Sequence, residues 1–77
     1  MADTRKTSVD RRVVGRRLRA LRGFEVNQAT LARELGVSQA QLSRYEKGTS
    51  EMGAEVLLRI SRRFGKSMEW VLTGEDR

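Results

Sequence analysis

The chain reads QATLARELGVSQAQLSRYEKG from Gln28 to Gly48, and the fold can be predicted outward from this stretch. Its apolar residues recur at helical spacing in two short runs, which predicts two helices that share an interior. The residues on that interior face are Leu31, Ala32 and Leu35 in the first run, and Leu42 and Tyr45 in the second. Ser38 stands just before the second run, where its hydroxyl can cap a helix N-terminus.

A Leu-Gly-Val turn separates the two runs, with Gly36 at its centre. Glycine adopts a positive φ at little cost, so a chain leaving one helix here can turn sharply into the next. Two short helices joined in this way are typical of a helix-turn-helix, in which the second helix enters the major groove of DNA. The stretch therefore predicts a DNA-binding motif at about residues 28–47.

The sequence closely resembles the Cro and phage-repressor type (XRE type) of helix-turn-helix family. The matching residues within the motif are Gln28, Leu31-Ala32, Leu35-Gly36-Val37-Ser38, Leu42-Ser43 and Glu46-Lys47-Gly48. Further matches are residues 18–22, Leu57, Phe64-Gly65, Ser67 and residues 70–74, so that the resemblance covers about residues 9–74. So many spaced matches are more specific than one short motif. The resemblance implies an all-α fold, a compact five-helix lambda-repressor-like domain that binds double-stranded DNA.

The segment ahead of the motif predicts a first helix that ends at Gly23. Thr7 and Asp10 have the spacing of a capping box that would start this helix. Its inward residues are Val14, Leu18 and Leu21. Asn27, just before the motif, is a suitable N-cap for the helix that begins at Gln28.

The segment after the motif predicts two more helices, over about residues 54–64 and 68–72. The apolar row of the first of these is Val56 or Leu57, Ile60 and Phe64. Gly65 ends that helix, Ser67 is a suitable N-cap for the last one, and Gly74 ends the ordered part.

The chain has 77 residues, enough for one small core. We expect a flexible basic arm over residues 1–8, one helix-turn-helix domain over residues 9–74, and a tail over residues 75–77. The chain has no cysteine, so neither a disulfide nor a thiolate metal site can brace it. No apolar run approaches the roughly 18 residues of a membrane span, and the start lacks the apolar region of a signal peptide. A cytoplasmic protein is the simplest interpretation.

The net charge of +6 is unevenly distributed. Residues 1–22 contain eight basic and two acidic residues, whereas residues 23–77 contain eight of each. All of the excess positive charge therefore lies in the leading arm and the first helix. A clustered basic field of this kind favours a polyanion as partner, although by itself it also fits a solvated helix face.

The second helix of the motif presents a polar face opposite Leu42 and Tyr45. This face has no large apolar side chain, so it is not built to be buried. Glutamine can pair with adenine, arginine can pair with guanine, and alanine can touch a thymine methyl group. We expect Gln39 and Arg44 to be the principal base readers. The lesser candidates are Ala40, Ser43 and Gln41.

The family resemblance implies that Gln28 contacts a phosphate and braces Gln39. It also places Gln41 in the groove, but Gln41 has the spacing to complete a capping box with Ser38, and both roles stay open. Gln28 lies at a helix N-terminus, where free backbone N–H groups and the helix dipole favour an anion. The other expected phosphate contacts are Ser38, Lys47, Arg5, Lys6, Arg11 and Arg12.

Two charged residues have a structural role in the family that this sequence resembles. The resemblance implies that Arg22 and Glu46 form a partly buried ion pair between the first helix and the recognition helix. The simpler alternative is two separate surface charges, since an exposed pair contributes only about 0–1 kcal/mol.

The last helix is the candidate dimer interface. One recognition helix reads few base pairs, and a symmetric pair of helices doubles the contacts. The apolar residues that this short helix offers are Met68, Trp70, Val71 and Leu72. Tryptophan is a frequent interface anchor, although Trp70 could instead complete the core of its own domain.

We therefore expect a sequence-specific regulator of transcription, most simply a repressor that binds an inverted-repeat operator as a homodimer. We do not expect an enzyme, because the chain has no histidine or cysteine and its carboxylates show no paired spacing. We expect no metal, cofactor or small-molecule ligand.

A basic amphipathic helix at a membrane surface is a weaker hypothesis, since the apolar face of the first helix is needed for the core. The remaining alternative is an antitoxin or controller that binds a partner protein and regulates its own operator.

Overall fold

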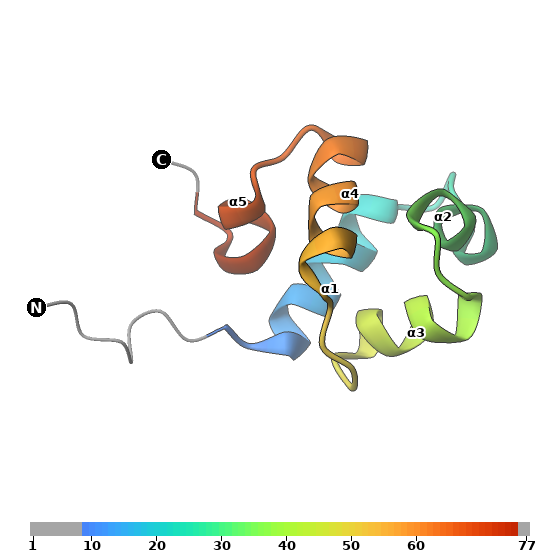
Figure 1. Ribbon diagram of the computed structural model, residues 1–77, viewed down its shortest axis with the longest axis horizontal. Helices are drawn as coiled ribbons and strands as arrows, with labels where there is room; N and C mark the ends of the chain where they lie inside the picture. Colours follow the sequence, from blue (N-terminus) through green and yellow to red (C-terminus); the bar gives the residue numbers. More distant parts are fainter. Residues whose placement is uncertain (1–8, 76–77) are drawn as a thin grey trace, which may run out of the picture.

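The computed structural model describes residues 9–75, and in that range it contains five helices and no strand. The helices are α1 (Arg11–Arg22), α2 (Gln28–Leu35), α3 (Gln39–Lys47), α4 (Ala54–Phe64) and α5 (Met68–Thr73). In Figure 1, α4 stands in front of α1, with α2 and α3 on one side and α5 on the other. The predicted all-α, five-helix architecture is confirmed.

Most helices begin at the residue expected from the sequence. The side chains of Asn27, Ser38 and Ser67 each accept a hydrogen bond from a backbone N–H in the first turn of α2, α3 and α5. The start of α1 is different, because Asp10 is itself the N-cap and accepts from the backbone N–H of Arg12 at 3.0 Å. The capping box predicted for Thr7 and Asp10 is therefore wrong in its assignment of Asp10, and Thr7 lies outside the described residues.

The core is formed by apolar residues from all five helices. Its buried members are Val14, Leu18, Leu31, Ala32, Leu35, Leu42, Tyr45, Leu57, Ile60 and Val71. The structure selects Leu57 rather than Val56 for the core row of α4, and it leaves Leu21 half-buried at the edge. Within residues 9–75, no helix combines the length and the apolar character that a bilayer span requires.

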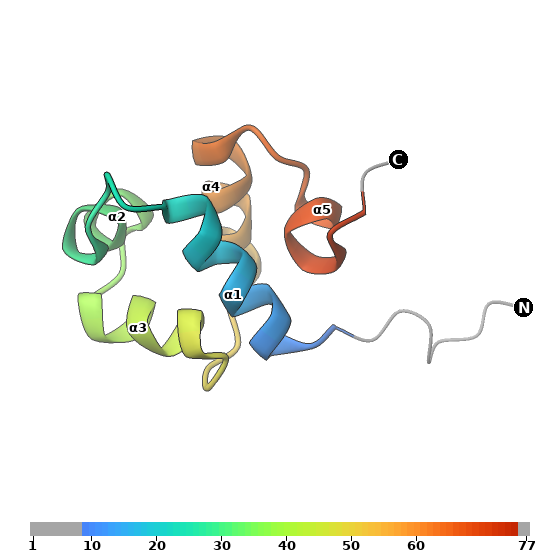
Figure 2. The same cartoon turned by 180° about the vertical axis from the view of Figure 1, so that it is seen from behind.

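Helix α1 crosses close to the end of α3 because Gly15 has no side chain. A Cβ placed on Gly15 would lie 2.5 Å from the carbonyl oxygens of both Tyr45 and Glu46, closer than two such atoms can approach. Figure 2, seen from behind, shows the start of α1 beside the end of α3. The close crossing brings side chains of α1 within reach of α3.

Candidate nucleic-acid interface

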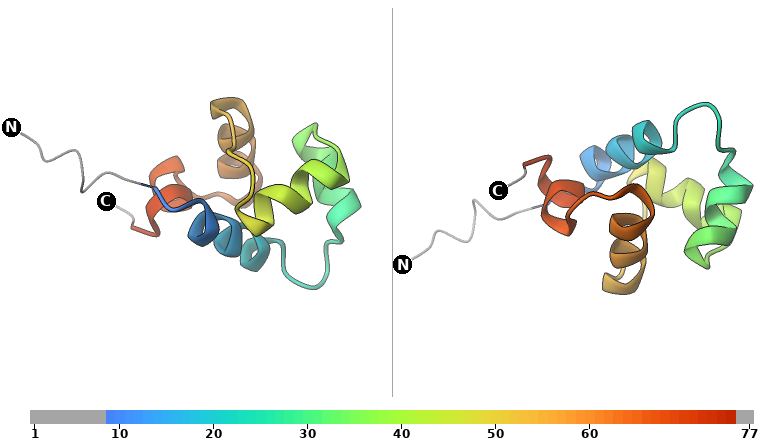
Figure 3. Two further views of the ribbon diagram at one scale, coloured as in Figure 1. Left: turned by 90° about the horizontal axis from the view of Figure 1, so that it is seen from below. Right: turned by 90° about the horizontal axis from the view of Figure 1, so that it is seen from above.

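Helix α3 lies on the underside of the molecule, and no other helix passes in front of it when the molecule is seen from below (Figure 3, left). Leu42 and Tyr45 are buried in the core, and they hold α3 against the other helices. On the opposite face, Gln39, Ala40 and Arg44 are exposed and Ser43 is half-buried. The helix therefore presents a polar edge to solvent, as the sequence predicts.

The turn between α2 and α3 has the geometry that the sequence predicts. Gly36 adopts φ 72° and ψ 29°, and its N–H donates to carbonyls in the last turn of α2. Helix α4 adds a second restraint, because the Arg59 Nη1 donates to the Leu35 carbonyl at 2.8 Å. Helix α4 also contacts α2 through the ion pair between Arg63 and Glu34, in which Nε and Oε2 are 2.6 Å apart. The backbone of Gly36 thus sets the turn into α3, and two cations of α4 hold the end of α2.

Arg22 and Glu46, which were expected to pair, meet side by side. Arg22 Nε lies 2.7 Å from Glu46 Oε2, and Arg22 Nη2 lies 2.9 Å from Oε1. The pair is largely buried, with 15% of the Arg22 side chain and 5% of the Glu46 side chain exposed. The hydrogen bond to Glu46 raises the pKa of Arg22, the charge of Glu46 adds to this effect, and burial opposes it. Arg22 Nη1 also donates to the Val26 carbonyl at 3.3 Å, which ties the α1–α2 connection to the pair.

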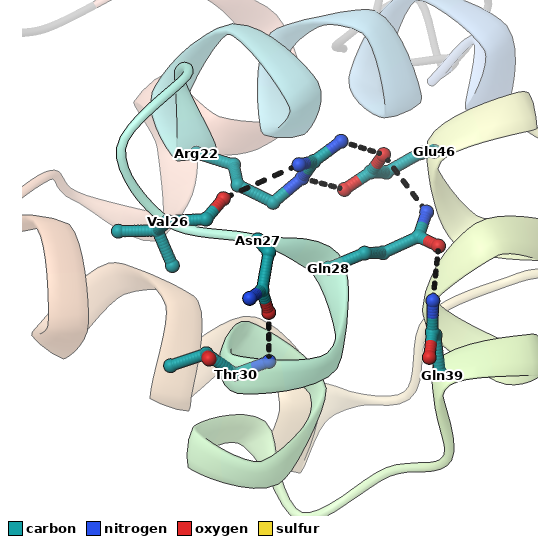
Figure 4. Close-up of polar contacts among 7 residues, drawn as sticks. All are labelled: Arg22, Val26, Asn27, Gln28, Thr30, Gln39 and Glu46. Atoms are coloured by element: carbon teal, nitrogen blue, oxygen red, sulfur yellow. Dashed lines mark hydrogen bonds and ion pairs between the residues drawn. The ribbon is translucent and has the colours of Figure 1, made fainter.

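A chain of hydrogen bonds leads from this ion pair to the first residue of α3 (Figure 4). Gln28 Nε2 donates to Glu46 Oε1 at 3.2 Å, and Gln39 Nε2 donates to Gln28 Oε1 at 3.4 Å. Because the Gln28 amide donates at one end and accepts at the other, its orientation is set by the Glu46 carboxylate. The structure therefore holds the Gln39 side chain against Gln28 at the N-terminus of α3.

Gln41 is committed to contacts within the protein at both ends of its amide. Its Nε2 donates to Ser50 Oγ at 3.1 Å, and its Oε1 accepts from Arg44 Nη2 at 2.9 Å and from Arg44 Nε at 3.3 Å. The backbone N–H of Gln41 donates to Ser38 Oγ at 3.0 Å, so Ser38 caps the helix. The side chain of Gln41, however, does not complete the capping box, because it is drawn toward Ser50 and Arg44 instead.

Three cationic residues expected to contact phosphates lie near the C-terminal end of α3. Lys47 is exposed in its last turn, and Arg11 and Arg12 are exposed at the start of α1. The backbone of Arg12 lies against Gly48, so these groups are close to the end of α3. A cleft beside α3 is lined by residues of three helices, namely Arg19, Arg22, Gln28, Ser43, Glu46 and Lys47. Arg5 and Lys6 lie outside the described residues.

The apolar residues of α5 divide between the core and the surface. Val71 is completely buried in the core of its own domain and has no exposed surface to offer a partner. Met68, Trp70 and Leu72 are half-buried. The Trp70 ring faces two cations, with Arg17 Cζ 5.7 Å and Lys66 Nζ 4.9 Å from its centroid.

Three residues with a part in this site were not identified from the sequence. Arg59 contacts the Leu35 carbonyl, and Ser50 contacts the Gln41 side chain. Neither partner lies within one helical turn of the other in the sequence, so no local pattern predicts these contacts. Gly15 had a signal, since a glycine inside a helix lowers helix propensity and often marks a close approach of two backbones.

Among residues 9–75, no three histidine, cysteine, aspartate or glutamate side chains gather as metal ligands would.

A family model described as helix-turn-helix matches residues 16–71. Two proteins with similar sequences are the antitoxin PezA of Streptococcus pneumoniae serotype 4 and PH1808 of Pyrococcus horikoshii, an HTH-type transcriptional regulatory protein by name. PezA is 35% identical over 66 residues, which are 84% of this chain and 41% of PezA. PH1808 is 40% identical over 60 residues, which are 74% of this chain and 18% of PH1808. The chain thus spans less than half the length of either relative.

A similar solved structure is that of the P22 c2 repressor in complex with a synthetic operator. The two structures superpose with a TM-score of 0.74 and 33% sequence identity. The match covers 80% of this chain and 96% of the repressor chain. The likeness therefore extends over nearly all of the described helices.

Proposed function

The chain belongs to the Cro and phage-repressor type of helix-turn-helix DNA-binding proteins, and we propose that it regulates transcription by binding a specific sequence of double-stranded DNA. The observation that carries this proposal is the exposed polar edge of α3, on which Gln39 is held in place through Gln28 by the Arg22–Glu46 pair. A polar edge that is held rigid yet left uncovered is suited to pairing with base edges.

Gln39 and Arg44 are the proposed base readers. An amide can donate to N7 and accept from N6 of adenine, and a guanidinium can donate to O6 and N7 of guanine. Gln39 retains a second N–H and its Oε1 while it donates to Gln28, so the adenine pairing stays possible. Ala40 and Ser43 lie between these two residues on the same edge and are lesser candidates.

The proposed phosphate contacts lie around this edge. Gln28 stands at the N-terminus of α2, where backbone N–H groups favour an anion. Lys47, Arg11 and Arg12 are exposed near the opposite end of α3 and can neutralise phosphates further along the strand. Ser38 is the remaining candidate at the N-terminus of α3. Arg5 and Lys6 belong to the same proposal on the basis of their charge alone.

We expect the protein to act as a homodimer on an inverted repeat. Two recognition helices related by a twofold axis would reach one DNA face at a spacing of about 34–36 Å. Met68, Trp70 and Leu72 of α5 are the candidate contact residues, because each keeps part of its surface exposed. A dimer that covers an operator within a promoter would repress transcription.

Selection of bound sequences from random duplex DNA is the decisive experiment. An inverted repeat should be enriched, with adenine and guanine at the positions that Gln39 and Arg44 reach. Sedimentation of the protein with the selected duplex should give two chains for each duplex. Retention of DNA without enrichment of any sequence at moderate salt would contradict the proposal, and one chain for each duplex would contradict the dimer.

The similarity to PezA supports a second candidate, because PezA is an antitoxin by name. In this case the chain would bind a partner protein and regulate its own operator with the same α3 edge. Purification of the tagged chain from its native cells should then recover one stoichiometric protein partner. If the purified chain carries no partner and still binds DNA, the simple regulator is favoured.

A further inference from the structure

We propose that Gln41 is a positioning residue that holds the Arg44 guanidinium on the outer edge of α3 and selects which of its two donor edges faces a base. The inference rests on the proposed function, since it assigns a means of specificity to the same interface. It replaces the expectation that Gln41 itself reads a base.

The contacts of Gln41 form a tether between a loop and the recognition helix. Ser50 lies in the α3–α4 connection, and its hydroxyl accepts from Gln41 Nε2 at 3.1 Å. The opposite end of the same amide, Oε1, accepts two donors of Arg44, at 2.9 and 3.3 Å. Gln41 is half-buried, whereas Arg44 is exposed. The loop thus fixes an amide that in turn fixes an exposed cation.

The geometry leaves one edge of the guanidinium available. A guanidinium has a side edge formed by Nε and Nη2, and an end formed by Nη1 and Nη2. Gln41 occupies the side edge of Arg44, since it accepts from both Nε and Nη2. The end of the group still has two parallel N–H donors, which match the O6 and N7 acceptors of guanine. The tether therefore orients Arg44 for end-on recognition.

Holding Arg44 before DNA arrives also lowers the cost of binding. An arginine side chain has much rotamer freedom, and ordering such a side chain on association is costly. A tether that orders it in the free protein removes part of this cost and favours the one orientation that suits guanine. Loss of the tether should weaken discrimination at the guanine position by about two- to tenfold.

A double-mutant cycle with Gln41→Met and Arg44→Ala tests this role. Binding is measured to the selected operator, and to operators changed at the guanine or at the base assigned to Gln39. Gln41→Met should reduce discrimination at the guanine position alone, and it should have no further effect in the Arg44→Ala background. Additive effects, or lost discrimination at a different base, would show that Gln41 reads DNA itself and would overturn the proposal. Unchanged discrimination by Gln41→Met would overturn it as well.

A second measurement follows the tether in the free protein, without DNA. The Arg44 Nε–H signal in NMR spectra should exchange with water slowly in the native chain and rapidly in Gln41→Met. Ser50→Ala should give an intermediate exchange rate, because Gln41 still accepts from Arg44 but no longer donates to the Ser50 hydroxyl. Thr49→Val is the matched control, since the Thr49 hydroxyl donates to the Arg44 backbone carbonyl at 3.3 Å and not to its guanidinium. Equal exchange rates in all four proteins would contradict the tether.

The two experiments separate this inference from the proposed function. If the native chain shows no sequence preference, the proposed function fails, and the exchange rates still decide whether Gln41 holds Arg44. If the native chain is selective but the cycle is additive, only the role of Gln41 fails.

Discussion

Two nitrogens of Arg22 on α1 donate to the two carboxylate oxygens of Glu46 on α3, at N–O distances of 2.7 and 2.9 Å. The same Glu46 Oε1 that accepts from Arg22 also accepts from Gln28, at 3.2 Å. One carboxylate therefore connects the packing of two helices to the orientation of the residue that braces Gln39. If Gln39 reads a base as proposed, this one group serves both stability and DNA recognition.

Replacement of Arg22 by methionine should destabilise the domain strongly. The change leaves the buried Glu46 carboxylate without its cation, which costs roughly 3–5 kcal/mol when a buried pair is broken. Urea unfolding provides the measurement. Arg19→Met is the matched control, because Arg19 is exposed on the same helix and its loss should change stability by no more than about 0.5 kcal/mol. Equal stability of the Arg22→Met protein and the native chain would refute the buried pair.

The contribution of this pair should be independent of pH around neutrality. The hydrogen bond to Glu46 raises the pKa of Arg22 in the folded protein. A cation whose folded pKa is raised stabilises fully below its unfolded pKa, and the contribution is lost as the pH rises through the folded pKa. The stability difference between the native chain and Arg22→Met should thus be the same at about pH 7 and about pH 9, and shrink only at strongly alkaline pH. A decline between the two pH values would be inconsistent with the raised pKa.

Gly15→Ala should destabilise the crossing of α1 and α3 although alanine is the better helix former. The added Cβ would meet two backbone carbonyl oxygens at 2.5 Å, and backbone cannot yield as a flexible side chain can. We expect a loss of about 1–3 kcal/mol in the free energy of unfolding, typical of overpacking. Thermal unfolding measures the effect, and a gain in stability would show that the helices can separate at no cost.

Gly53→Ser should stabilise the start of α4. Gly53 is the N-cap, with φ −71° and ψ 166°, and it supplies no side-chain hydrogen bond. A Cβ at this position meets open space, so the serine hydroxyl can accept from the first turn without strain. The expected gain is a few tenths to about 1 kcal/mol. Gly53→Ala is the control, and serine should be more stable than alanine; the reverse order would exclude a capping bond.

Arg44→Ala and Lys47→Ala should affect DNA binding differently. Loss of Arg44 should cost about 1–3 kcal/mol on the selected operator and relax the preference at one symmetric base position. Loss of Lys47 should weaken binding to all sequences alike and reduce the salt dependence by about one counterion. Affinities measured on selected and scrambled duplexes over a range of salt separate the two. If Lys47→Ala instead weakened binding to the selected duplex alone, Lys47 would have to contact bases in the groove and not phosphates.

The helices of this protein were predictable because their ends depend on local interactions. Asn27 and Ser38 cap helices by accepting from a backbone N–H three residues ahead, and Gly36 ends α2 through its own backbone angles. Each of these signals lies within one turn of the residue that it affects. The error at the start of α1 was also local. The sequence offered two residues, Thr7 and Asp10, that could act as the N-cap, and the structure uses Asp10.

The contacts that complete the interface were not predictable in this way. Arg59 reaches the Leu35 carbonyl across 24 positions of sequence. Val71 has the same apolar character as its neighbours, yet it alone of the four α5 candidates is fully buried. Neither fact follows from periodicity, because both depend on how helices from different parts of the chain pack.

Helical spacing and capping were enough to place the five helices and to indicate that the polar edge of α3 faces outward. The family resemblance also implied that Gln28 braces Gln39 and that Arg22 pairs with Glu46, and both contacts are present. The contacts of Gln41 with Ser50 and Arg44, and the hydrogen bond that joins Gln28 to the ion pair, came only from the packed molecule. Gln28 can orient Gln39 because α1 supplies Arg22 to Glu46, and Gln41 can hold Arg44 because the α3–α4 loop supplies Ser50. Helix formation is governed by neighbours a turn away, whereas the direction of a long polar side chain is governed by partners that only folding brings near.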